Sequence, residues 1–303
     1  MLRLRAPAKL NLSLRILGRR SDGYHDIETL FERIDLADEL RIEPAETLTL
    51  TSSDPGLSCG EDNLILKAAR VLQQAGGTLQ GARIHLTKRI PVAAGLGGGS
   101  SDAAATLRGL NELWHLGLEP SRLLELGSVL GADVPFFLHE TPFAIGRGRG
   151  EVCEPLEAFP LAHVLVMPPE RLSTQAVYDA WDASAPEIRL TAAAPSITMM
   201  AHALRNGSLG ELAEGLWNDL EPEAIRRCPV IATIQACLRA CGCLGTRMSG
   251  SGSAVFGLCT DAAHARTVHA RLPRWIANNI QRGLPGAWHT AVIQTDKLTP
   301  VLS

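Results

Sequence analysis

Aromatic residues, lysines and long apolar runs are all scarce in this chain. Aromatic side chains make up 4% of its 303 residues, and only two of them are tyrosines. No apolar run reaches the roughly 18–20 residues that cross a bilayer, and residues 1–7 lack the apolar core of a secretory signal. The net charge of −3 provides no bulk attraction to nucleic acid. We therefore expect a cytoplasmic protein with neither a membrane nor a nucleic-acid partner.

The seven cysteines follow no disulfide framework. Four of them gather late in the chain, at Cys228, Cys237, Cys241 and Cys243. A structural zinc site uses two cysteine pairs, or one pair with histidines at finger-like spacing, and neither pattern is present. We therefore expect reduced thiols that pack as small apolar side chains, and no metal held by them.

Hydrophobic periodicity predicts both strands and helices in the first half of the chain. Alternation of apolar and polar residues predicts strands over 1–17, 27–52 and 82–90. A spacing of three to four residues predicts helices over 64–75, 100–116 and 121–131. Asp62 and Asn63 are expected to cap the first of these helices, Gly76 and Gly77 to end it, and Ser121 to cap the last.

The second half has the same mixed character, so the fold class is predicted to be α+β throughout. Strand-like sequence over 142–167 is followed by helices predicted at 174–182, 196–205, 208–218, 229–241 and 261–271. Short strands are predicted at 162–167, 244–248, 253–258 and 289–294. Prolines at 155, 160, 168 and 169 mark a change of composition. We place a domain boundary there, giving domains over 1–153 and 154–303.

The most informative segment is residues 91–101, Pro-Val-Ala-Ala-Gly-Leu-Gly-Gly-Gly-Ser-Ser. Its glycines permit positive φ angles and leave backbone N–H groups open to a ligand. It leads from a predicted strand into a helix N-terminus, which favours an anion, so we predict a phosphate-binding loop. A Walker A loop would need Gly-Lys, which the chain lacks, and the dinucleotide pattern would need glycine at 100 or 102. A flexible turn before a tightly packed helix is the alternative.

Lys9 and Asp133 are further candidates for chemistry. Alternation puts Lys9, Asn11 and Ser13 on one face of the first strand, where a cation beside an amide could orient a phosphate or could simply be solvated. Asp133 stands between Gly131 and an apolar run. It could accept the proton of a substrate hydroxyl, or it could satisfy backbone N–H groups in the turn before a proline.

Three turn segments could contact a ligand. Tyr24 and His25 follow an Asp-Gly turn and would suit a flat heterocycle, or would pack on the turn itself. Residues 248–256 form a second loop of small residues, which could close over phosphates or be a plain turn. Residues 146–150 read as a surface turn whose two arginines could attract an anion.

Together these segments resemble the GHMP kinase superfamily, small-molecule kinases with a Gly/Ser phosphate loop. The three motifs of that superfamily match residues 7–11, 91–101 and 249–253. The resemblance implies a two-domain α+β fold, with an N-terminal ribosomal S5 domain 2-like domain that binds ATP and a C-terminal ferredoxin-like domain. It also implies ATP and Mg²⁺ as cofactors, a small-molecule substrate, and a monomer or weak homodimer.

Five segments are similar to one branch of that superfamily, which acts on a cytidine-diphosphate-linked polyol. They are residues 8–12, 22–25, 61–65, 95–102 and 131–135. The resemblance implies ATP-dependent phosphorylation of the 2-hydroxyl of 4-diphosphocytidyl-2-C-methyl-D-erythritol, a step of non-mevalonate isoprenoid precursor synthesis. Two alternatives stay open: a GHMP kinase for another alcohol, such as homoserine or a sugar, and a non-catalytic nucleotide sensor on the same fold.

The same resemblance implies a role for each candidate residue. Asp133 would be the general base on the acceptor hydroxyl, with Lys9 paired to it and to the transferring phosphoryl group. The resemblance assigns no magnesium ligand. Asp102 and Ser101 are candidates from their place beside the loop, or Asp102 could simply cap the predicted helix and complement its dipole. The ATP site would comprise Asn63, Leu64, Lys88, Pro91, Val92, Ala93, Ala94, Gly95, Leu96, Gly97, Gly98, Gly99, Ser100 and Ser101. The acceptor site would comprise Asn11, Tyr24, His25, Phe31, Thr174 and Tyr178, with the tyrosines enclosing cytosine and His25 hydrogen-bonding its edge.

Overall fold

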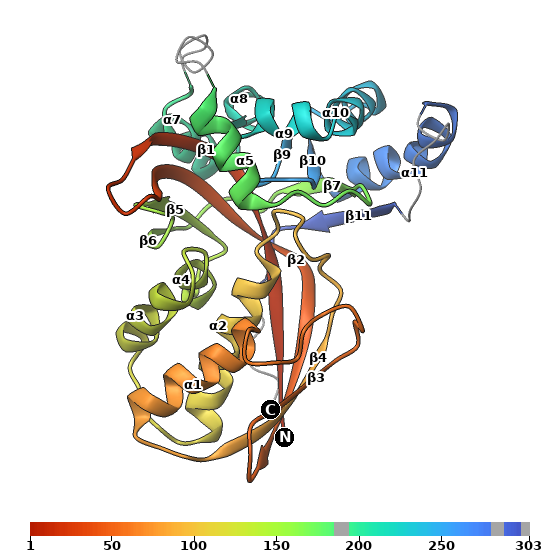
Figure 1. The fold of residues 1–303 in the computed structure, drawn as a ribbon. Helices are drawn as coiled ribbons and strands as arrows, with labels where there is room; N and C mark the ends of the chain where they lie inside the picture. The colour runs from red at the N-terminus through yellow and green to blue at the C-terminus, as the bar shows by residue number, and fades with distance from the viewer. Residues whose placement is uncertain (185–193, 280–287, 298–303) are drawn as a thin grey trace.

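A long antiparallel hairpin runs through the whole molecule. The computed structural model describes residues 1–184, 194–279 and 288–297. In it, β1 (Leu2–Arg19) and β2 (His25–Ala45) pair along nearly their full length and pass from one layer of the fold into the other (Figure 1). The pairing register shifts at three places along the hairpin. Such bulges bend a strand and increase its twist, which lets one hairpin serve both layers.

The hairpin forms the centre of a seven-stranded sheet. The order is β3-β4-β2-β1-β8, with β5 paired to β2 and β6 paired to β5. The remaining strands are β3 (Thr49–Ser52), β4 (Gly81–Thr87), β5 (Phe143–Arg147), β6 (Val152–Leu156) and β8 (Trp217–Asn218). The helices against this sheet are α1 (Leu64–Gly76), α2 (Gly98–Leu113), α3 (Pro120–Leu130) and α4 (Val134–Leu138). Small residues on α2 such as Ala103 and Ala104 are fully buried, so this helix packs closely on β1 and β2.

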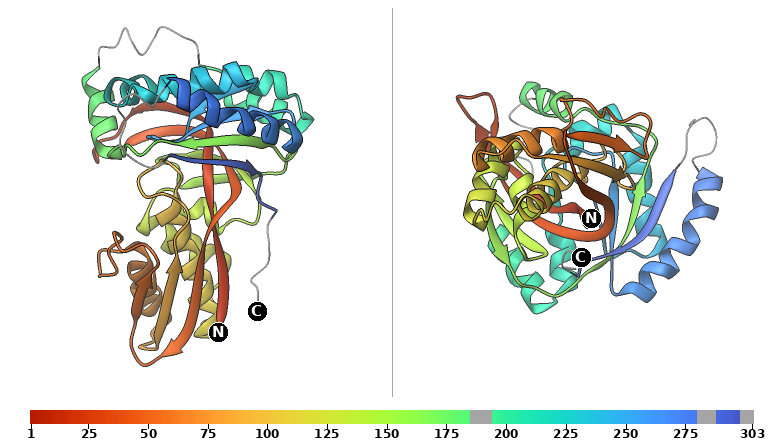
Figure 2. Two further views of the ribbon diagram at one scale, coloured as in Figure 1. Left: turned by 90° about the vertical axis from the view of Figure 1, so that its right-hand side faces the viewer. Right: turned by 90° about the horizontal axis from the view of Figure 1, so that it is seen from below.

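A four-stranded antiparallel sheet lies across the end of the hairpin, as Figure 2 shows from the side. Its order is β11-β7-β10-β9, with β7 (Ala162–Met167), β9 (Gly245–Met248), β10 (Val255–Cys259) and β11 (His289–Gln294). The helices of this layer are α5 (Thr174–Ala183), α7 (Ile197–Asn206), α8 (Leu209–Gly215), α9 (Glu221–Arg227), α10 (Val230–Cys241) and α11 (Ala262–Asn279). Strands and helices therefore mix in both halves, which confirms the α+β prediction.

Most predicted elements are present, with differences that have local causes. Asn63 caps α1 by accepting from the Ile65 N–H, and Gly77 ends that helix in the left-handed region, as predicted. The predicted cap at Ser121 is wrong, because Pro120 already occupies the first turn and Glu119 is the capping position. The helix predicted over 208–218 stops at Gly215, since the next residues pair with β1. Two short helices, α4 and α9, were not predicted.

The predicted domain division at residue 153 remains a prediction. Residue 153 lies inside β6, which is hydrogen-bonded to β5 of the larger sheet, and the smaller sheet begins with β7 at Ala162. Within the described ranges, no helix is long and apolar enough to cross a membrane. The seven cysteines are free, and the described residues contain no group of three His, Cys, Asp or Glu side chains that could hold a metal ion.

A buried polar cluster joins the two sheets. Glu32 on β2 is fully buried, and it accepts a hydrogen bond from the Thr295 hydroxyl and contacts the His163 ring, both at 2.7 Å. The same hydroxyl accepts from the Leu161 N–H at 2.7 Å. A buried polar group that loses its partner retains its full desolvation cost, so this cluster specifies how β7 and the residues after β11 dock on β2.

The cluster predicts a loss of stability in Thr295→Val. The substitution keeps the volume of the side chain but leaves Glu32 and the Leu161 N–H each without this partner. We expect the free energy of unfolding to fall by about 1–3 kcal/mol. Denaturant unfolding measures this loss of stability. The control is Thr49→Val, an exposed change on the edge strand β3 that we expect to cost under about 0.5 kcal/mol. Equal stability of the two variants would contradict the role assigned to the cluster.

Candidate functional site

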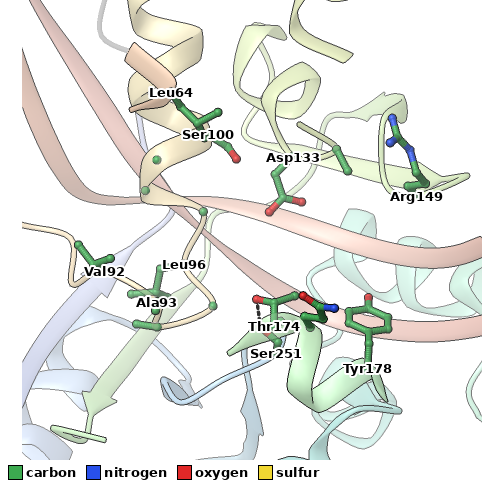
Figure 3. A pocket seen from close by; sticks show the side chains of 18 of the residues that line it. Leu64, Val92, Ala93, Leu96, Ser100, Asp133, Arg149, Thr174, Tyr178 and Ser251 are labelled. Atoms are coloured by element: carbon green, nitrogen blue, oxygen red, sulfur yellow. Dashed lines mark hydrogen bonds between the residues drawn. The ribbon is translucent and has the colours of Figure 1, made fainter. Parts of the chain in front are cut away.

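The loop over residues 91–97 joins β4 to α2 and lines one side of the main pocket (Figure 3). Gly95 and Gly97 adopt positive φ angles of 78° and 68°. A Cβ atom at Gly95 would lie 2.1 Å from the Ser249 carbonyl oxygen, so only glycine fits there. The Leu96 carbonyl accepts from the Lys9 N–H at 3.0 Å, which ties the loop to β1.

The loop presents backbone N–H groups at the start of α2. Gly97 is the capping residue of this helix, and no side chain caps it. The first N–H groups of a helix have no partner within the helix, and the helix dipole adds positive potential there. Gly98, Gly99 and Ser100 line the pocket at this point. Such an arrangement can bind an anion, and the predicted loop that leads into a helix N-terminus is present.

Lys9, Asn11 and Asp133 meet in the middle of the pocket. The Lys9 ammonium donates to the Asn11 side-chain oxygen and lies 3.6 Å from an Asp133 carboxylate oxygen. The Asn11 amide in turn donates to the Thr29 hydroxyl at 2.8 Å, which orients it. The Lys9 side chain is 5% exposed and the Asp133 side chain is 31% exposed. The solvated-face alternative for Lys9 is therefore wrong, because the strand is buried on both faces at this point.

Asp133 immediately precedes α4, and its carboxylate points into the pocket (Figure 3). Within the part of the chain that the structure describes, its side chain makes no capping hydrogen bond to α4. The alternative in which Asp133 satisfies backbone N–H groups of the turn is therefore wrong. A partly exposed carboxylate beside a buried ammonium can accept a proton from a bound hydroxyl.

Lys88 lies below the loop between two buried carboxylates. Its ammonium is 2.5 Å from Asp38 and 3.0 Å from Asp102. Burial raises the pKa of Asp102 to about 7, although the Lys88 charge acts to lower it. A Cβ at Gly98 would lie 2.9 Å from the Lys88 ammonium nitrogen, so the lysine packs directly under the helix start. Its charge is therefore already compensated by protein groups.

An imidazole and several aromatic rings form the other end of the pocket. The His25 and Tyr178 rings stack with centroids 4.9 Å apart, and the Trp181 ring meets His25 edge-on at 5.6 Å. Tyr24 is 58% exposed, and the Arg149 guanidinium lies 5.0 Å from its ring centroid. Burial raises the pKa of the Tyr178 phenol, so the hydroxyl stays protonated. These groups, contributed by the β1–β2 turn, α5 and the 146–150 turn, offer flat surfaces to a ligand.

Thr174 links this end of the pocket to the second small-residue loop. Its hydroxyl is 2.8 Å from the Ser251 hydroxyl, and both residues line the pocket (Figure 3). The Ser249 hydroxyl donates to the Gly95 carbonyl at 3.0 Å. The loop around residues 249–253 therefore closes on the 91–97 loop from the other half of the chain, rather than forming an isolated turn.

Nearly all predicted site residues surround one cavity of about 1080 Å³. Two of them do not. Phe31 is fully buried and stacks on Phe136 behind the Lys9 side chain, because its side chain points into the core of the larger sheet. Ser101 is also buried, since it lies on the face of α2 that packs inward. The predictions that Phe31 lines the acceptor site and that Ser101 lines the ATP site are therefore wrong. Both side chains lie in the protein interior beneath the cavity wall.

Sequence analysis missed Asp182, Trp181 and Arg19. The signal for Asp182 was helical spacing, because positions 174, 178 and 182 fall four residues apart and share one helix face. Arg19 lies at the end of β1, and its Nε is 3.5 Å from Asp182. No local pattern marked it, since the pairing joins residues far apart in the chain.

The comparisons with known proteins agree with this geometry. The models of the GHMP kinases N-terminal and C-terminal domains match residues 63–141 and 200–278. The chain is similar to 4-diphosphocytidyl-2-C-methyl-D-erythritol kinases of Pelotomaculum thermopropionicum, at 44% identity over 89% of this chain and 93% of that protein. The protein of that name from Salinibacter ruber is 42% identical over 86% of this chain and 91% of that protein.

Solved structures show the same relationship. A crystal structure of 4-(cytidine 5'-diphospho)-2C-methyl-D-erythritol kinase has a TM-score of 0.77 at 38% identity, covering 96% of this chain and 98% of that one. A homoserine kinase from Cytophaga hutchinsonii has a TM-score of 0.75 at 19% identity over 97% and 94% of the two chains, a likeness of fold alone. The chain belongs to the GHMP kinases, and within them to the 4-diphosphocytidyl-2-C-methyl-D-erythritol kinases.

Proposed function

We propose that this protein transfers the γ-phosphoryl group of ATP to the 2-hydroxyl of 4-diphosphocytidyl-2-C-methyl-D-erythritol. The observation that carries the proposal is one continuous cavity with an anion-binding loop at one end, aromatic rings at the other, and the Lys9–Asp133 pair between them. The names of the relatives support the same reaction. We further infer a cytoplasmic setting and a monomer or weak homodimer.

ATP would bind at the end of the cavity that the loop and α1 form. The N–H groups of Gly98 to Ser100 would hold its phosphates, with Asn63 and Leu64 beside the nucleoside. Lys88 would act on ATP only indirectly, because its ammonium already pairs with Asp38 and Asp102.

Magnesium would accompany ATP, since Mg²⁺ is commonly held by one or two carboxylates together with substrate phosphates. Asp102 fits such a ligand, because its Oδ1 is buried without a hydrogen-bond partner among the described residues. The ion would neutralise phosphate charge when bound. The Ser101 hydroxyl is also buried without a partner, but it lies beneath the pocket wall, so it fits this role less well.

The reaction would run at Asp133. The 2-hydroxyl oxygen attacks the γ-phosphorus, the bond from that phosphorus to the ADP oxygen breaks, and the hydroxyl proton passes to the Asp133 carboxylate. The Lys9 ammonium, 3.6 Å from that carboxylate, would stabilise the charge that develops on the transferring group. Asn11 would hold Lys9 in place and orient the acceptor. Phosphoryl transfer asks mainly for positioning and charge compensation, and these residues supply both.

The acceptor would place its cytosine among the aromatic residues. Tyr24 and Tyr178 offer ring faces, His25 offers a polar ring edge, and Thr174 offers a hydroxyl on the same side of the cavity. The competing acceptors homoserine and mevalonate carry no flat base that would use these rings. A non-catalytic sensor would have no use for the Lys9–Asp133 pair.

A coupled ADP-release assay with ATP, Mg²⁺ and 4-diphosphocytidyl-2-C-methyl-D-erythritol tests the proposal, run beside homoserine, mevalonate and galactose. We expect release with the cytidyl substrate alone. ADP release with another alcohol would support a kinase activity but contradict the proposed acceptor. ATP binding with no release from any acceptor would favour the sensor.

Asp133→Asn should lower kcat by at least about 10²-fold while leaving the Kd for ATP nearly unchanged. The amide keeps the shape of the side chain but cannot take the hydroxyl proton. Steady-state kinetics and nucleotide titration measure the two effects. Asp261→Asn, the same chemical change on an exposed residue at the start of α11, is the control and should keep normal turnover. Undiminished kcat in Asp133→Asn would remove this residue from the mechanism.

Tyr24→Ala should raise the KM for the cytidyl substrate by roughly tenfold or more, because a base–aromatic stack is lost. The KM for ATP should stay constant, since the ring lies at the other end of the cavity. Phe159→Ala, which removes another exposed ring outside the cavity, is the matched control. Equal acceptor KM values for the two variants would argue against cytosine at this end.

A further inference from the structure

His25 is held by a carboxylate from the other half of the chain. Its Nε2 lies 2.8 Å from an Asp182 oxygen, and the second oxygen of that carboxylate is 3.5 Å from Nε of Arg19. The residues come from the β1–β2 hairpin and from α5, 157 positions apart for the His25–Asp182 pair. The His25 side chain is 7% exposed, and that of Asp182 is 20% exposed.

The imidazole is also fixed by its neighbours. Tyr178 stacks on one ring face with an interplanar angle of 29°, and Trp181 meets the ring edge-on at 90°. Three side chains of α5, spaced along one helix face, therefore hold this single ring. Such a ring cannot turn over to exchange its two nitrogens without breaking these contacts, so its hydrogen-bonding edge has one orientation.

The carboxylate decides which nitrogen of the ring carries the proton. An ionised carboxylate only accepts hydrogen bonds, so Nε2 is the N–H nitrogen, and in the neutral imidazole Nδ1 then carries the lone pair. Among the described residues, Nδ1 makes no hydrogen bond, and His25 lines the cavity. The pocket therefore contains a fixed hydrogen-bond acceptor.

A fixed acceptor distinguishes cytosine from uracil. Cytosine presents an exocyclic amino group, which donates, at the position where uracil presents a carbonyl oxygen, which accepts. An acceptor nitrogen facing that position would accept a hydrogen bond from the cytosine amino group. The same nitrogen would face the lone pairs of the uracil carbonyl oxygen and be repelled by them. When an analogue lacks the N–H that the site accepts, the buried acceptor of the site stays without a hydrogen bond. The site therefore rejects that analogue strongly.

We propose that Asp182 is a specificity-determining positioning residue, which holds His25 in the Nε2–H form so that Nδ1 accepts from the cytosine amino group. The inference rests on the proposed function, because it requires the cytosine of the acceptor to lie at this ring. Asp182 does not touch the base; it acts through His25.

The test compares kcat/KM for the cytidyl substrate and for its uridyl analogue, 4-diphosphouridyl-2-C-methyl-D-erythritol, in wild type and in Asp182→Asn. The amide can donate to Nε2 as well as accept from it, so it permits both proton positions on the ring. We expect the preference for the cytidyl substrate to fall by about 10- to 100-fold. Asp26→Asn is the matched control, because it removes a carboxylate one residue from His25 that pairs with Arg20 instead, and its preference should stay at the wild-type value.

A merely structural role for Asp182 would change KM for both substrates together and leave their ratio at the wild-type value, which would overturn the inference. Nitrogen-15 NMR of histidine-labelled protein provides a readout that does not need enzymatic activity. The His25 signals, assigned by their loss in His25→Gln, should show an unprotonated Nδ1 in the wild type. A protonated Nδ1 would overturn the proposal. Absence of ADP release by the wild type with the cytidyl substrate would instead overturn the proposed function.

Discussion

The buried ammonium of Lys9 is the constraint on which the site depends. Removing a charge from water is costly unless hydrogen bonds and an opposite charge replace the solvent, and here Asn11 and Asp133 do so. Space is the second requirement. A Cβ at Gly97 would lie 3.0 Å from a carbon of the lysine side chain, and one at Gly250 would lie 3.2 Å from its ammonium nitrogen. Two glycines from separate loops therefore make room for one lysine.

This constraint explains why residues distant in the sequence must converge. The β1 strand brings the cation, the turn before α4 brings the carboxylate, and the loops over 91–97 and 249–253 cover them. The polar cluster of Glu32, His163 and Thr295 docks the four-stranded sheet on β2. This docking holds the 249–253 loop over the 91–97 loop. The chemistry of the site and the stability of the junction between the sheets are in this way connected through one hairpin.

Local patterns in the sequence predicted those parts of the site that are continuous in the chain. The glycine loop, the shared face of Lys9 and Asn11 and the caps of α1 are all short-range signals, and the structure has them as predicted. The predicted alternation is wrong beyond Asn11, because a register shift follows that residue and Leu14 lines the cavity where Ser13 was expected. Whether a side chain lines the cavity or lies in the core was harder to predict. Phe31 and Ser101 lie in the predicted segments but point inward, because strand pairing and helix packing decide which face is buried. The Asp182–His25 and Lys88–Asp38 contacts join residues whose meeting only the tertiary fold determines.

The fold and the choice of acceptor have separate origins in this molecule. A homoserine kinase shares this fold at low sequence identity, so the two-layer fold alone does not select a substrate. The part that can select one is the far end of the cavity, where the hairpin turn meets α5. There the long, bulged hairpin carries His25 across to a helix of the other layer, where the His25 ring stacks on Tyr178. Under the proposed function, selectivity would follow from how the two layers meet at the hairpin turn, and the 91–97 loop and the Lys9–Asp133 pair would serve whatever hydroxyl is brought to them.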